Sequence, residues 1–173
     1  MRTEKFFFVI VLTVVSLFAL ISMVGAKAAD TGVVTATVSA QNIAVSVTDG
    51  GVTYGTLGMG SSANTTSTGG NHDSQTAQNT GNISESLNIK GQNSTAWTLE
   101  ATAASEKYTH KFCITNCDTT PVWNSLSVGY TTLSTGIGVT ASQAFDLMIG
   151  TPTITTNYDS QSVNVTVQAV TGS

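Results

Sequence analysis

Charged side chains are scarce in this chain of 173 residues, which holds six Lys and Arg, ten Asp and Glu, and two His. After residue 28 the basic residues are Lys90, Lys107 and Lys111, too few and too scattered to neutralise several phosphates. Nucleic acid is therefore not an expected partner. With 9% charged and 40% hydrophobic residues, the surface must consist largely of neutral hydroxyl and amide groups.

Helical periodicity is also lacking after residue 29, where apolar and polar residues alternate instead. The alternating or β-branched runs predict eight to nine strands, over residues 33–39, 43–48, 52–57, 83–90, 96–103, 108–114, 127–133, 144–149 and 162–170. Asp49, Gly50 and Gly51 predict a hairpin turn between the second and third of these strands. Residues 58–73 are rich in Gly, Ser and Thr and predict a flexible surface loop.

Many short strands, each with one apolar face, need a second sheet to cover that face. The sequence therefore predicts an all-β fold, a two-layer antiparallel β-sandwich of the jelly-roll or immunoglobulin-like type. A single such domain is expected over residues 29–173.

One long apolar run is present, and it lies at the N-terminus. Arg2 and Lys5 precede apolar residues 6–24, and Ala26 and Ala28 are small residues at the positions that a signal peptidase reads. Residues 1–28 are therefore expected to be a signal peptide, with cleavage before Ala29, in a secreted, extracellular or cell-surface protein. The run approaches the roughly 20 residues that span a bilayer, so an uncleaved anchor is the alternative. In either case this segment alone would contact the membrane.

Cysteine occurs twice, at Cys113 and Cys117. An oxidising compartment outside the cell favours a disulfide between them. The alternative is a metal site that also recruits His110, but three ligands without a fourth nearby make a poor zinc site. A disulfide is expected, and no metal or other cofactor.

Catalytic patterns are missing too. No serine lies in a Gly-x-Ser-x-Gly elbow, and the sequence cannot bring Glu85, Glu100 and Asp146 to the separation that a glycosidase pair requires. His110 shares a strand face with aromatic residues, which predicts a position at the edge of the core and a hydrogen bond to the backbone. No catalytic site is expected.

Three further side chains are candidates for ligand contact or for the core. Trp97 alternates in phase with Leu99 and is expected to pack in the core. Trp123 lies close to the cysteines in a stretch where exposure and a stacking role are possible. His72 lies in a Gly, Asn and Asp turn, where a loop is the default and a weak ligand site is the alternative.

Two stretches resemble the TasA/camelysin group of secreted proteins: SAQNIAVSVTDGG at residues 39–51 and QNTGNIS at residues 78–84. The first is similar to the first core strand of that group, and the second to the turn that begins its next sheet strand. The resemblance implies a jelly-roll subunit of an extracellular fibre that lends an N-terminal strand to the neighbouring subunit.

The expected function is that of an exported, non-enzymatic structural protein that associates with itself. The candidate donor strand contains Val33, Val34, Ala36 and Val38, with Val34, Ala36 and Val38 on one face. The alternative is a monomeric surface module that binds a glycan or a protein partner.

Overall fold

The computed structural model describes residues 31–172, so the predicted signal segment lies outside the described residues. Contacts divide the chain after Ser39 into the units Met1–Ser39 and Ala40–Ser173. Every strand among residues 31–172 belongs to the second unit. The strand expected over residues 33–39 is not formed in the single chain, and the side chains of residues 31–39 are exposed. Within residues 31–172, no helix is long and apolar enough to cross a membrane.

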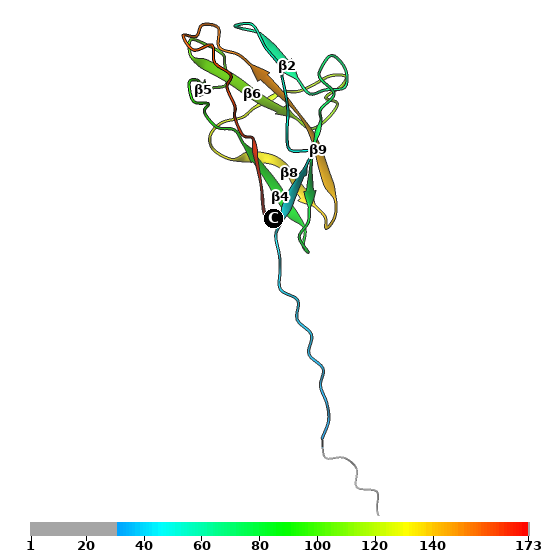
Figure 1. Ribbon diagram of the computed structural model, residues 1–173. Helices are drawn as coiled ribbons and strands as arrows, with labels where there is room; N and C mark the ends of the chain where they lie inside the picture. Colours follow the sequence, from blue (N-terminus) through cyan, green and yellow to red (C-terminus); the bar gives the residue numbers. More distant parts are fainter. Residues whose placement is uncertain (1–30, 173) are drawn as a thin grey trace, which may run out of the picture. The chain divides into compact units, whose positions relative to one another are not determined.

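The larger of two sheets has seven strands and supplies the wider layer (Figure 1). Its main path runs, in spatial order, through β1 (Val45–Thr48), β3 (Gln75–Asn79), β9 (Ser142–Gly150), β6 (Lys107–Cys113) and β5 (Thr98–Leu99). Two short strands pair outside this path, β2 (Ser62–Asn64) with β9 and β7 (Asn124–Ser125) with β6. All of these pairs are antiparallel except β5 with β6.

The smaller sheet has three antiparallel strands, in the order β10 (Thr166–Thr171), β4 (Glu85–Lys90) and β8 (Thr131–Ile137). The two sheets pack together, which confirms the predicted all-β sandwich. Their facing side chains form one core: Ala77, Leu87, Ile89, Leu99, Tyr108, Phe112, Leu126, Leu133, Ile137, Phe145 and Leu147. Trp97 is partly buried, packs against this core as predicted, and donates from its indole nitrogen to Thr155.

The predicted hairpin around Gly50 is wrong. Asp49 and Gly50 both adopt positive φ angles and turn the chain, but residues 52–57 form no strand. β1 instead pairs with β3, so that Val45 lies opposite Asn79. Strand β3 was not predicted because its buried alternating positions include Gln75 and Asn79, and these polar side chains hide the apolar period.

The loop predicted over residues 58–73 is anchored rather than loose, and it contains β2. Thr65 is fully buried, and its hydroxyl donates to Asp146 over 2.8 Å. The same carboxylate accepts from the Ser74 hydroxyl. Local composition predicted flexibility because it cannot reveal a hydrogen-bond partner about eighty residues away along the chain.

Cys113 and Cys117 are joined by a disulfide, as predicted, with Cα atoms 5.8 Å apart. It follows β6 and closes a short loop that also contains Asn116, which has a positive φ angle.

Replacing both cysteines by alanine is expected to lower the free energy of unfolding by about 2 kcal/mol or less, because so small a ring removes little entropy from the unfolded chain. Guanidinium unfolding of the variant and of the oxidised parent measures the difference. A variant that fails to fold would show instead that the fold depends on this disulfide.

Candidate functional site

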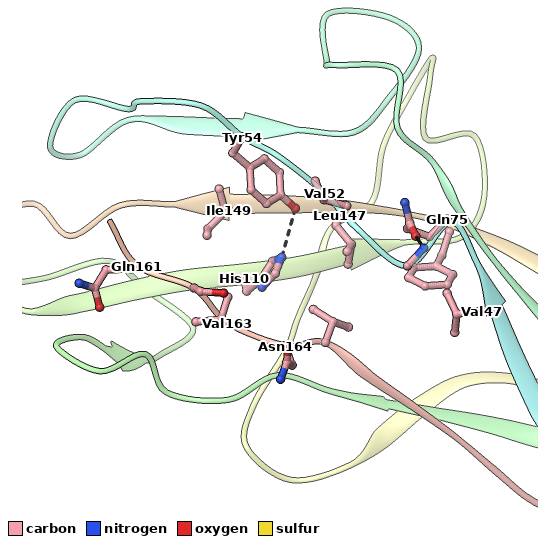
Figure 2. Close-up of a pocket in the computed structure, with 14 residues that line it drawn as sticks. Val47, Val52, Tyr54, Gln75, His110, Leu147, Ile149, Gln161, Val163 and Asn164 are labelled. Atoms are coloured by element: carbon pink, nitrogen blue, oxygen red, sulfur yellow. Dashed lines mark hydrogen bonds between the residues drawn. The ribbon is translucent and has the colours of Figure 1, made fainter. Parts of the chain in front are cut away.

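A groove of about 210 Å³ lies on the inner face of the larger sheet, where the smaller sheet does not cover it (Figure 2). Its floor comes from β3, β6 and β9, one rim from the chain that follows β1, and the other rim from the chain that precedes β10. The apolar side chains that line it are Val47, Val52, Tyr54, Phe145, Leu147, Ile149, Val163 and Val165.

The strands beside this groove have unused edges. Among the described strands, β1 pairs with β3 alone and β10 pairs with β4 alone. Val47 of β1 and Val165, next to β10, both line the groove. Each of these strands therefore has one edge that no described strand pairs with, although β1 and β10 contact each other. Such an edge can accept an extended segment.

The backbone of the rims is also unpaired. Within the described part of the chain, no backbone-to-backbone hydrogen bond involves residues 51–57 on one rim or residues 162–164 on the other. One side-chain hydrogen bond reaches the backbone of these rims in the described structure: the Asn71 amide donates to the Thr53 carbonyl. Free N–H and C=O groups on both rims can accept a peptide strand by β-augmentation.

His110 lies in the floor of the groove between Tyr54 and Val163 (Figure 2). Its side chain is 3% exposed, and its Nε2 is 3.2 Å from the Tyr54 hydroxyl. The expected hydrogen bond to a backbone group is therefore replaced by one to a phenol. The other ring nitrogen, Nδ1, is buried and has no hydrogen-bond partner in the described structure.

Burial governs the electrostatics of this pair. Desolvation lowers the pKa of His110 to about 4, so the imidazole is neutral at neutral pH. Desolvation also raises the pKa of Tyr54, with smaller contributions from Asp73 and Asp146. The groove is lined by apolar side chains together with the uncharged polar groups of Gln75, Gln161, Ser162, Asn164 and His110, and it contains no charged side chain.

The side chains proposed for ligand contact lie elsewhere. His72 is exposed, has a φ of 57°, and lies near Asp118, the residue that follows the disulfide loop. Hydrogen bonds from Ser67 lower the pKa of Asp118, with a smaller contribution from His72. Trp123 is half-buried. Neither His72 nor Trp123 lines the groove.

The three carboxylates considered for hydrolysis have different structural partners. Glu85 is fully buried and accepts from the backbone N–H of Ala44 over 3.3 Å. Glu100 forms an exposed ion pair with Lys107, and Asp146 accepts from the hydroxyls of the buried Thr65 and of Ser74. In residues 31–172, no group of three His, Cys, Asp or Glu could hold a metal ion.

Sequence reasoning missed the groove although it had found several of its parts. Val163 and Val165 lay in a predicted strand, as did Val52 and Tyr54, and His110 was assigned to the core edge. Nothing local indicated that these segments meet. Comparison with protein-family models, curated proteins and solved structures finds no match to this chain.

Proposed function

We propose that this protein is an exported structural subunit that assembles into filaments at the cell surface or outside the cell, without enzymatic activity. In this proposal, residues 31–39 of one copy dock as a strand in the groove of the next copy. The observation that carries the proposal is the coexistence, in one chain, of an exposed segment with apolar side chains and a groove lined partly by apolar side chains.

The segment has the properties of a donor strand. Val34 and Val38 are each more than 90% exposed in the single chain, so burying them would supply a driving force for association. Val34, Ala36 and Val38 share one face of an extended strand. Nine extended residues span about 30 Å.

The chain path favours docking on a neighbour over docking on the same subunit. Residues 40–44 continue the pairing of β1 beside residues 80–82: Thr80 donates to the Ala44 carbonyl, Asn82 donates to Asn42, and the Asn82 amide also donates to Ala40. An extended path places Ala40 about 23 Å along the chain from Val47.

To reach its own groove, the segment would therefore have to reverse direction next to Ala40. Of Ser39, Ala40 and Gln41, only Ser39 is a residue type that is common in tight turns. Docking on a neighbour needs no reversal. Such a contact is heterologous, and it extends into a filament when its rotation does not close a ring.

A synthetic peptide of residues 31–40 tests the proposal. Added in excess to protein expressed from residue 29, the peptide is expected to occupy free grooves and to reduce the filament yield at least severalfold, as measured by sedimentation and electron microscopy. A peptide with the same residues in scrambled order is the control.

Two results would contradict the proposal. The protein could remain monomeric under all conditions, with binding to an immobilised glycan that Trp123→Ala removes, which would identify a monomeric surface module. Alternatively, filaments could form equally well with either peptide present, which would assign assembly to a different surface.

A further inference from the structure

The smaller sheet ends at β10 before it covers all of the larger sheet. It has three strands against seven, and the floor that it leaves bare belongs to β3, β6 and β9 (Figure 2). Sheets in a sandwich pack about 10 Å apart, and neighbouring strands within one sheet lie about 4.8 Å apart. One further strand beside β10 would therefore continue the smaller sheet over this floor.

The free edge of β10 is closed at one end and open at the other. At the closed end, Ala44, just before β1, donates to the side chain of Glu85, and Glu85 lies opposite Thr171 of β10. At the open end, Val47 of β1 and Val165 both line the groove. The two strands therefore approach each other near Thr171 and leave the start of β10 accessible.

The backbone that leads into β10 suits a strand pair. No residue from 162 to 171 has a positive φ angle, and residues 162–164 make no backbone-to-backbone hydrogen bond within the described chain. Within β10, antiparallel pairing with β4 uses the N–H and C=O groups of alternate residues and directs the others to the free edge. From residue 162 onwards, this edge therefore offers a continuous row of donors and acceptors.

The opposite rim suits a strand pair less well. Gly50 and Gly55 have φ angles of 70° and 71°, which are not those of extended backbone, so an extended run between them can be no longer than residues 51–54. Within this run, the Thr53 carbonyl already accepts from the Asn71 amide. This rim therefore offers a partner strand fewer hydrogen bonds than the edge of β10.

We infer that residues 31–39 of the neighbouring copy dock as a fourth strand of the smaller sheet, hydrogen-bonded through the main chain to the edge formed by residues 162–166. The side of the docked strand that faces residues 51–57 stays unpaired. This inference rests on the proposed function and names the edge that holds the strand.

This position explains how the valine face of the segment is buried. Side chains directly opposite each other in a strand pair point to the same face of the sheet. Val163 and Val165 line the groove and pack against the core. In a strand beside them, Val34, Ala36 and Val38 would lie level with these two valines and point into the groove.

Disulfide trapping tests which rim holds the strand. The acceptor is the chain from residue 29 with Val34→Asp and Val38→Asp, which disable its own segment as a donor. It also carries a new cysteine at an exposed position of one rim, either by Asn164→Cys beside β10 or, as the matched control, by Thr53→Cys. Circular dichroism confirms that both acceptors are folded.

Four peptides of residues 31–40 each carry one cysteine on the outward face of the segment, so that one of them lies near Asn164 in any register. The substitutions are Val33→Cys, Thr35→Cys, Thr37→Cys and Ser39→Cys. The Cα atoms of residues that face each other across a strand pair lie within disulfide range. Under mild oxidation, at least one peptide is therefore expected to give at least tenfold more cross-linked product with Asn164→Cys than any peptide gives with Thr53→Cys.

Non-reducing electrophoresis measures the product, and mass spectrometry confirms that Cys113 and Cys117 are still joined to each other. Equal products on the two acceptors, more product on Thr53→Cys, or no product on either would overturn the inference. The proposed function would survive each of these results as long as the unmodified peptide binds the acceptor. Failure of that peptide to bind would overturn the proposed function as well.

N-methylation of the peptide tests whether one rim or both rims pair with it. In a strand paired on one side, the N–H groups of alternate residues point to the partner and the others point away. One peptide is N-methylated at Ala36 and Val38, and the other at Thr35 and Thr37. By fluorescence anisotropy, one of the two is expected to bind at least tenfold more weakly than the unmodified peptide, and the other within threefold of it. Similar affinities of the two methylated peptides would overturn the one-sided pairing.

Discussion

Filament formation is expected to be abolished when Val34 and Val38 are both replaced by aspartate in protein expressed from residue 29. Both side chains are more than 90% exposed in the single chain, so the substitutions cost the subunit little stability. In the docked state, each carboxylate would have to enter an apolar groove with no cation to pair with. The burial of an unpaired charge costs several kcal/mol, more than a peptide strand of this length can recover.

The control for this pair is Thr35→Asp with Thr37→Asp, which adds the same charge to the same segment on its opposite face. This control is expected to retain at least half of the filament yield, measured by sedimentation and electron microscopy at physiological ionic strength. Equal loss of filaments in both variants would point to general charge repulsion between subunits. Equal retention of filaments in both variants would show that Val34 and Val38 are not part of the assembly contact.

Acidification is expected to destabilise the folded subunit through His110. Burial lowers the pKa of its imidazole from 6.5 to about 4, so between these values the unfolded chain binds a proton that the folded chain does not. Stability therefore rises with pH in this window. The contribution is fully present above pH 6.5 and is lost progressively as the pH falls towards 4, to a total of about 3 kcal/mol.

Denaturant unfolding between pH 7 and pH 4 measures this slope. His110→Gln removes the titrating group and keeps an amide that can bond to Tyr54, so its stability should change much less over the same range. Hydrogen bonds from Thr155 and Thr156 to Glu106, and from Ser67 to Asp118, lower the pKa of each carboxyl group, so these groups also lose stability at the acid end of this window, where the unfolded carboxyls protonate. Both are present in His110→Gln, so the difference between the two proteins measures His110. A parent protein with the same pH dependence as His110→Gln would show that water reaches the imidazole.

A neutral groove also bears on assembly. His110 bonds to the phenol of Tyr54 and is uncharged at neutral pH, so a docking strand meets no charge in the floor. Protonation of His110 would place a cation beneath the apolar face of that strand. The same acidic range that weakens the fold should therefore also weaken docking.

The sequence by itself determined the fold class and the disulfide. Strands β4, β6 and β9 carry enough apolar or aromatic residues that burial on a sheet follows from their composition, and the alternation around Leu87 and Ile89 is local information. Cys113 and Cys117 are close enough in the chain for their pairing to follow from spacing and compartment. The exposed valine face of residues 33–38 was likewise visible as a pattern.

Only the tertiary structure decided the partner of β1, the existence of β3 and the position of the groove. Gln75 and Asn79 are buried in β3 because distant groups satisfy them: Gln75 accepts from Gly50, and Asn79 donates to the Ile137 carbonyl. A hydropathy pattern scores such residues as exposed. The groove depends on five segments separated by up to more than one hundred residues. Among its polar side chains, His110 has one ring nitrogen within hydrogen-bond distance of Tyr54 and the other without a partner in the described chain. Long-range hydrogen bonding and packing, rather than local periodicity, therefore determine the pairing of β1, the strand β3 and the groove.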